Sequence, residues 1–153
     1  MRNNRISVEL SCKTEYALLA LLELASHYPQ GEPLQIRQIA ALQKIPDRYL
    51  EQLLATLKRG GLLLSQRGAR GGYLLAREPW KITLLDVINC LEGLDSQAAS
   101  TSHSSATTLG STVVKEVWQE VYQEVMEILK RYTLQDLSDK RNSRSQLDIM
   151  YYI

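Results

Sequence analysis

The chain has 153 residues and a formal net charge of +1, with 44% hydrophobic and 23% charged residues, a composition that excludes a disordered or fibrous chain. No apolar run reaches the roughly 18 residues that a membrane-spanning helix needs. The opening residues, MRNNRISVEL, also lack the apolar stretch of a signal peptide. We therefore expect a cytoplasmic protein with no membrane partner.

The charge is unevenly distributed along the chain. Residues 35–77 contain eight basic and two acidic residues, a net charge of +6, whereas residues 83–139 contain three basic and nine acidic residues, a net charge of −6. A strongly basic half favours a polyanionic partner. Two unrelated solvated faces would give the same charges, so charge alone does not identify that partner.

Apolar periodicity predicts three helices in the first 60 residues. KTEYALLALLELASHY (13–28) is apolar on nearly all sides, which indicates a central helix. LQIRQIAALQK (34–44) predicts a shorter helix. Leucines at helical spacing predict a third helix over 47–59, with Pro46 suited to its start and a glycine pair to its end.

A β-hairpin and a short helix are predicted next. The pieces LLLSQR and GYLLAR flank the glycine-bearing loop GARG, which is the pattern of a hairpin over residues 62–77. Thr83 and Asp86 have capping-box spacing, so TLLDVINCLEG (83–93) is predicted to be helical. Three helices followed by a hairpin predict a winged helix-turn-helix domain over residues 8–93, in a fold that is mainly α.

The second half of the chain differs in texture. Residues 94–111 are rich in serine, threonine and alanine, and we expect a flexible linker loop there. Residues 112–138 are expected to form a long dimerisation helix and a short cap, because a heptad stripe requires a partner helix. The pattern predicts no element in the tail, 139–153. The stripe, with spacings alternating between 4 and 3, consists of Val114, Trp118, Val121, Val125, Ile128 and Tyr132.

The predicted helix-turn-helix (about 34–59) supplies candidate base contacts at the start of its second helix, the recognition helix. Residues at that end of a recognition helix meet the base edges in the major groove. Arg48 suits guanine or a phosphate, Gln52 suits adenine, and Glu51 suits the amino group of cytosine. Tyr49 is assigned equally to the core and to the DNA backbone.

Four more basic residues complete the candidate DNA-binding set. Lys58 and Arg59 fall in the last turn of the recognition helix, and Arg67 and Arg70 belong to the hairpin tip, the wing. Arginines on a glycine-bearing tip can enter a narrow minor groove or hold phosphates. The sequence contains no P-loop or dinucleotide fingerprint and no cluster of His, Cys or carboxylates, so we predict no enzyme. The rival interpretation is a winged-helix module that docks a partner protein.

Four segments together resemble the IscR/NsrR (Rrf-two) family of bacterial winged helix-turn-helix transcription regulators: EYALLALLELA, IRQIAALQKIPDRYLEQLLATLKRGGLL, RGARGGYLLAR and ITLLDVINCLEG. A long helix and TLQDL after the linker extend the resemblance over about residues 8–138. The resemblance implies a homodimer in which the long helix crosses to the partner subunit, bound to a partly palindromic double-stranded DNA site. The resemblance also implies that the residues at the family's DNA-contact positions are Arg48, Tyr49, Glu51, Gln52 and Arg67.

The chain departs from this family at the cofactor. Many members hold an iron–sulfur cluster through three cysteines between the short and the long helix, and residues 94–111 contain none. The place of an acidic ligand falls at Glu15, but one carboxylate without thiolates cannot hold a cluster. Cys12 and Cys90 have no metal-ligand spacing, and we expect packed thiols. We therefore expect no cluster or other metal. Thiol-based redox sensing through either cysteine, an unknown effector and a partner protein stay open.

Overall fold

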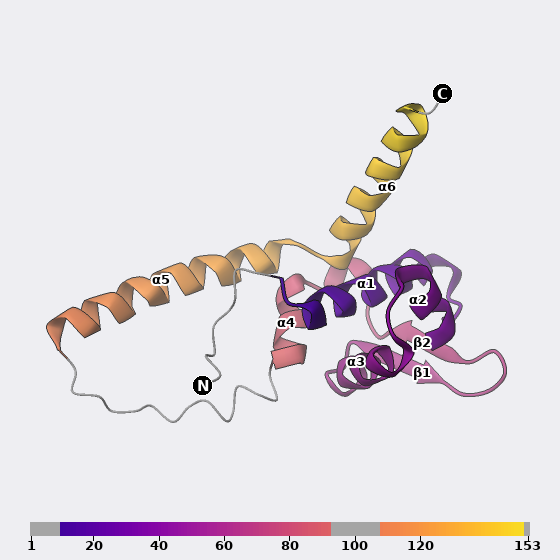
Figure 1. The fold of residues 1–153 in the computed structure, drawn as a ribbon, viewed down its shortest axis with the longest axis horizontal. Coiled ribbons are helices and arrows are strands. Elements are labelled where there is room, and N and C mark those ends of the chain that lie inside the picture. The colour runs from indigo at the N-terminus through magenta and orange to yellow at the C-terminus, as the bar shows by residue number, and fades with distance from the viewer. Residues whose placement is uncertain (1–9, 93–107, 152–153) are drawn as a thin grey trace.

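The computed structural model describes residues 10–92 and 108–151. The limits expected at residues 8 and 93, and most of the expected linker, lie outside these ranges. A winged helix-turn-helix domain holds the first four helices and the hairpin, and two long helices project from it (Figure 1). The elements are α1 (Cys12–Ser26), α2 (Ile36–Gln43), α3 (Asp47–Arg59), β1 (Leu63–Gln66), β2 (Gly72–Leu75), α4 (Leu84–Glu92), α5 (Leu109–Arg131) and α6 (Leu134–Tyr151).

The expected fold class, mainly α with a small β-hairpin, is confirmed, and α1 is its central helix. The Ser11 hydroxyl caps α1 by accepting from the Thr14 amide at 3.2 Å. The helix then packs against α2, α3, α4 and β2. Burial of a leucine side chain stabilises the fold by roughly 1.5–3 kcal/mol. The buried apolar residues of α1 and α3 are Ala17, Ala20, Leu21, Leu24, Ala25, Leu50, Leu53, Leu54 and Leu57.

A tight turn joins α2 to α3. Lys44 adopts a left-handed conformation (φ 54°) that ends α2, and its amide donates to the Ala40 carbonyl. Ile45 is buried in the core. Pro46 has an extended ψ and precedes the first residue of α3, where a missing amide hydrogen costs nothing. The turn therefore sets the angle of α3 through one strained residue and one buried residue.

The hairpin is tied to the segment that leads into α2. β1 and β2 are antiparallel, with Leu63 opposite Leu75 and Gln66 opposite Gly72. Tyr73 and Leu34 exchange two backbone hydrogen bonds of 2.8 and 3.0 Å. A β-carbon on Gly72 would lie 2.4 Å from the Leu34 carbonyl oxygen, so this close approach requires glycine. The wing and the helix-turn-helix therefore form one packed unit.

The junction between α5 and α6 is anchored on this domain. The Leu84 amide donates to the Tyr132 carbonyl, and the Leu134 amide donates to the Ile82 carbonyl, each at 2.9 Å. The side chains of Ile82 and Leu134 are fully buried. The segment before α4 and the segment before α6 are therefore hydrogen-bonded to each other. Because Ile82 and Leu134 are also buried, the first turns of α4 and α6 are held together.

Two similar capping boxes start α4 and α6. Thr83 and Asp86 cap each other's backbone amides at 3.0 and 3.1 Å, as expected. Thr133 and Asp136 do the same at 2.8 and 3.2 Å. Each box satisfies two amides that a helix start leaves unpaired.

Two sequence-based boundaries need correction. The expected short cap and unplaced tail form one helix of 18 residues, α6, ending at Tyr151. Residues 139–146 in its middle are all polar, and the apolar residues of its last turn are exposed, so no continuous apolar stripe marks this helix in the sequence. The expected linker also extends too far, because α5 begins at Leu109 with Thr108 as its cap. Within the described ranges, no helix is long and apolar enough to cross a bilayer.

Candidate nucleic-acid interface

One face of α3 is buried and the other is exposed and polar. The leucines of α3 pack into the core, whereas Arg48, Glu51 and Gln52 are exposed in its first turns. Lys58 and Arg59 are exposed in its last turn. All five candidate residues thus lie on the side of the helix that faces away from the domain, which is the geometry that major-groove contact requires.

Tyr49 differs from the rest of the set. Its side chain is partly buried, and its ring packs edge-on against Tyr16 of α1, with ring centroids 5.6 Å apart. An edge-to-face aromatic pair of this kind stabilises packing. Tyr49 therefore lies at the boundary between the core and the exposed face, in keeping with its divided assignment.

A groove of about 760 Å³ lies between the outer face of α3 and the wing. Lys58 lines it and donates from Nζ to the Ser65 hydroxyl of β1 at 2.6 Å. Arg59 lines it as well and donates to the Thr56 hydroxyl at 3.4 Å. The lining is completed by Gln52, Ala55 and Tyr73. The two cations at the end of α3 thus line a groove that β2 of the hairpin also borders.

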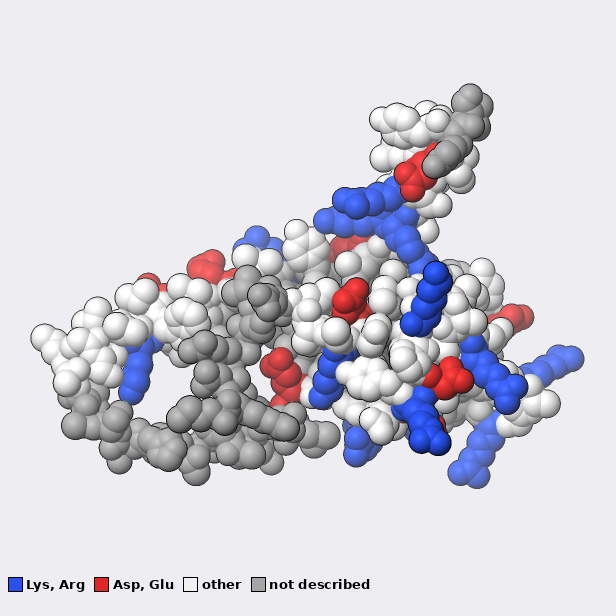
Figure 2. Space-filling view, in the orientation of Figure 1, with Lys and Arg blue, Asp and Glu red and all other residues white. Residues whose placement is uncertain are grey.

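The wing tip carries two exposed arginines. Arg67 and Arg70 flank Gly68, whose φ of 108° lets the chain reverse. The Gln35 side chain donates to the Ala69 carbonyl at 3.4 Å and so tethers the tip to the start of α2. Lysine and arginine side chains project from the part of the molecule that holds α2, α3 and the wing (Figure 2). Exposed cations on α2, α3 and the wing could each contact a different phosphate of one polyanion.

None of the candidate cations is neutralised by a carboxylate within residues 10–92 and 108–151. The salt bridges in these ranges are Arg77–Asp86 at 3.7 Å, Lys81–Glu78 at 3.5 Å, Lys130–Glu127 at 3.4 Å and Arg141–Glu23 at 2.7 Å. Unpaired cations on one face attract phosphates and release counterions on binding.

Two further basic residues, Arg37 and Lys44, are exposed in and just after α2, and the sequence pattern gave neither of them a role. Arg37 is exposed in the first turn of α2, and Lys44 is exposed in the turn before α3. The first helix of a helix-turn-helix crosses the DNA backbone, so both are candidates for phosphate contacts. Both are among the basic residues of 35–77, so the charge of that segment includes them. Neither lies in the recognition helix or the wing, so the sequence pattern alone did not point to a DNA contact at either residue.

The heptad stripe of α5 is exposed. Val114 and Trp118 are 68% and 63% exposed, and Val121, Ile128 and Tyr132 are also exposed, whereas Val125 is partly covered. α5 buries none of its residues against the rest of the chain. Exposed apolar side chains in a row along one helix make this stripe a candidate interaction surface.

The two cysteines lie in different environments, and the expectation that both are packed is wrong for Cys12. Cys12 is exposed as the first residue of α1, where helix periodicity has not yet begun to select a buried face. Cys90 packs against the core, and its thiol lies 3.5 Å from the Thr56 carbonyl. Burial raises the pKa of the Cys90 thiol, opposed by the Gly60 backbone and the Arg59 charge.

The described residues offer no metal-binding cluster. Residues 10–92 and 108–151 contain no group of three His, Cys, Asp or Glu side chains that is placed to hold an ion. Glu15, the counterpart of the acidic ligand, is exposed on α1. The remaining residues of the chain contain no cysteine. The whole sequence therefore supplies two thiol side chains, Cys12 and Cys90.

Comparison with known proteins gives consistent similarities. Residues 10–140 match the Rrf2 family, whose description is "Iron-dependent Transcriptional regulator". The chain is 34% identical over 146 residues to the HTH-type transcriptional regulator CymR of Bacillus subtilis (strain 168), which covers 95% of this chain and 100% of CymR.

Solved structures agree with the sequence matches. The fold is similar to T. potens IscR with a TM-score of 0.72 and 36% identity, over 89% of this chain and 90% of that one. It is similar to CymR, the global cysteine regulator of B. subtilis, with a TM-score of 0.71 and 34% identity, over 88% of this chain and 98% of that one.

Proposed function

The chain belongs to the Rrf2 family of HTH-type transcriptional regulators, and from this premise we propose that it binds a partly palindromic DNA site as a homodimer, without an iron–sulfur cluster. Membership of a regulator family implies DNA binding and separates the chain from the enzymes. The observation that carries the proposal is the exposed basic surface formed by α3 and the wing, whose cations form no salt bridge with any other residue that the structure describes.

The α3 surface supports a division of roles among the contacts. Arg48, Glu51 and Gln52 carry base recognition from the first turns of α3, and Arg67 and Arg70 hold the backbone or the minor groove from the wing. Glu51 is an acid close to phosphates, which is unfavourable unless it selects a base or rejects wrong sequences.

The α5 stripe supports the homodimer. Its apolar side chains lie on a helix with no fully buried residue among the described ones, so a second copy of α5 is the partner that matches them in length and pattern. A dimer places two recognition helices about 34–36 Å apart, one turn of DNA, and makes the site two-fold related.

The donor set supports action without a cluster. The whole chain has two cysteines, one exposed at the start of α1 and the other packed beneath α3. The family description mentions iron, but protein-bound clusters are held mainly by thiolates, commonly about four. Iron and sulfide analysis of purified protein tests this point, and a brown preparation with stoichiometric iron and sulfide would overturn it.

A gel shift on the DNA upstream of the protein's own gene, with random duplex as competitor, tests the proposal against its rival. A regulator keeps its specific complex in excess random DNA, and the affinity falls steeply with salt because cations displace counterions. A protein-docking module binds both duplexes equally weakly. Arg67→Ala should weaken the specific complex, and an unchanged complex would contradict the role of the wing.

Thiol-based sensing is a second candidate function, favoured by the exposure of Cys12. An exposed thiol is open to oxidation, whereas a packed thiol is protected. Under this alternative, mild oxidation changes DNA affinity in the wild type and not in Cys12→Ser. Equal affinity of oxidised and reduced wild-type protein would remove it.

A further inference from the structure

A carboxylate is buried on the otherwise apolar side of α1. Glu23 is 7% exposed and lies between the buried residues Leu21 and Leu24. Burial of a charged side chain is unfavourable unless it is paired and hydrogen-bonded, and an apolar residue would fill the same place at no such cost. The presence of Glu23 at this position therefore calls for a role beyond packing.

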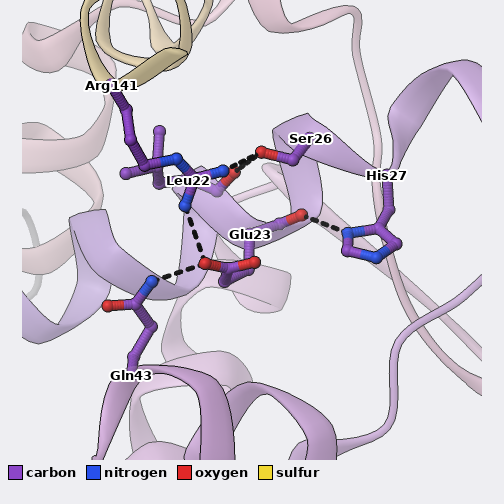
Figure 3. Close-up of polar contacts among 6 residues, drawn as sticks. All are labelled: Leu22, Glu23, Ser26, His27, Gln43 and Arg141. Atoms are coloured by element: carbon purple, nitrogen blue, oxygen red, sulfur yellow. Dashed lines mark hydrogen bonds and ion pairs between the residues drawn. The ribbon is translucent and has the colours of Figure 1, made fainter. Parts of the chain in front are cut away.

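The hydrogen-bond partners of Glu23 come from two different helices, α2 of the helix-turn-helix and α6 at the end of the described chain. Arg141 of α6 reaches Oε1 of Glu23 at 2.7 Å, and Gln43 of α2 donates to the same oxygen at 2.5 Å (Figure 3). The second guanidinium nitrogen of Arg141 donates to the Ser26 hydroxyl, which in turn donates to the Leu22 carbonyl at 3.0 Å. One carboxylate oxygen thus joins α1, α2 and α6.

The position of Gln43 connects this site to the DNA-binding surface. Gln43 is the last residue of α2, and the left-handed Lys44 and the buried Ile45 that set the angle of α3 follow it directly. A contact that fixes the Gln43 side chain therefore restrains the end of α2 and the turn into the recognition helix. Gln43 itself points toward α1 in Figure 3.

The position of Arg141 connects the site to the other half of the chain. Arg141 lies two turns into α6, which begins where α5 ends and is anchored there by Leu134. Among the side-chain hydrogen bonds of the described residues, those of Arg141 are the ones that join α6 to another element. Movement of α5 and α6 relative to the domain would therefore act on this contact.

We propose that Glu23 is a positioning residue for DNA binding, through which the docking of α6 by Arg141 is coupled to the angle of the helix-turn-helix by Gln43. The inference rests on the proposed DNA-binding function. Under this proposal none of the three residues contacts DNA itself. Because coupling between two sites is reciprocal, DNA bound at α3 also strengthens the docking of α6.

Three variants test the coupling. Arg141→Met keeps the long stem and removes the charge, and Gln43→Met removes only the link to α2 while the Glu23–Arg141 pair stays. Arg144→Met, the matched control, makes the same change one turn further along α6 at an exposed position. Specific-site affinity is measured as a function of salt. Amide exchange of residues 138–146 is measured with and without the DNA duplex.

We expect Arg141→Met and Gln43→Met to lower specific affinity by roughly tenfold, within the usual range of coupling between sites. The slope of affinity against salt stays at the wild-type value, because no phosphate contact is lost. DNA slows exchange in α6 of the wild type and of Arg144→Met, and this protection disappears in the two other variants. A residue that only stabilises the fold would not alter DNA-dependent protection.

Three results would overturn the inference. Unchanged affinity in both Arg141→Met and Gln43→Met removes the coupling. A salt slope reduced by about 0.9 in Arg141→Met assigns Arg141 a direct phosphate contact instead. Equal exchange in α6 of free and DNA-bound wild type removes the reciprocity. If the wild type itself has no specific site, the proposed function fails as well, and the wild-type titration separates these cases.

Discussion

The end of the recognition helix packs against Cys90 so closely that a side chain at Gly60 would collide with the thiol. Gly60 caps α3 with φ −75° and ψ 0°, a conformation that alanine adopts freely. A β-carbon there would lie 2.0 Å from the Cys90 sulfur and 3.2 Å from its β-carbon. Gly60→Ala therefore isolates a packing conflict with no backbone strain.

The size of the effect follows from two opposing contributions. Overpacking in a close-packed region destabilises the fold by about 1–3 kcal/mol. Replacement of glycine by alanine in a permitted conformation stabilises it by about 0.4–1 kcal/mol, because the unfolded chain loses conformational entropy. A hollow of about 430 Å³ beside Cys90 gives the sulfur room to rotate, which favours the low end. At that low end the packing conflict costs about 1 kcal/mol, so once the stabilisation through the unfolded chain is subtracted we expect a net loss of about 0–0.6 kcal/mol in the free energy of unfolding.

Urea unfolding of a double-mutant cycle measures this conflict. In a Cys90→Ala background the sulfur is absent, so Gly60→Ala should be neutral or stabilising. Gly61→Ala is the control: no atom lies within 4 Å of its added β-carbon, but its φ of 81° makes alanine unfavourable in both backgrounds. An equal cost of Gly60→Ala with and without the sulfur would refute the packing argument.

Three other predictions concern the dimer, the thiols and the wing. Trp118→Glu places a charge in the apolar stripe of α5 and should convert the proposed dimer to monomers in sedimentation equilibrium. A mass equal to that of a dimeric wild type would exclude this stripe as the interface. Cys12 should react with a thiol reagent faster than Cys90 at neutral pH, and Cys90 should need a higher pH than an ordinary thiol because burial raises its pKa. Equal rates at pH 7 would contradict these environments. Gly72→Ala should destabilise the fold by about 1–3 kcal/mol, since its β-carbon would collide with the Leu34 carbonyl, and a wild-type melting temperature would contradict that contact.

The parts of the fold that the sequence predicts well are those in which several local signals coincide. The bounds of α3 were predicted because leucine periodicity, Pro46 and a glycine pair agree on one segment. The hairpin was predicted from apolar runs on both sides of a glycine-bearing loop. Each of these signals involves only a few neighbouring residues, so the element can be predicted without knowledge of the tertiary structure.

The parts that sequence reasoning missed depend on contacts between distant residues. Residues 139–146 of α6 include no apolar residue that would mark a helix. The helix is fixed by Leu134 in the core and by Arg141 on Glu23, 118 residues away. Glu23 is an acidic residue in an apolar helix, but its neighbours in the sequence do not predict that Gln43 and Arg141 bind it. Cys12 was misjudged because burial at a helix end depends on what packs there.

Selection of binding sites from random duplexes, with affinities measured for the selected sites, tests the central claim most directly. For the wild type we predict a partly palindromic site whose half-sites are about one helical turn apart. Glu51→Ala should change the selected sequence more than the affinity, and Arg67→Ala should lower the affinity while keeping the sequence. Absence of an enriched two-fold site, or the same shift in both variants, would contradict the assignment of base reading to α3 and backbone contact to the wing.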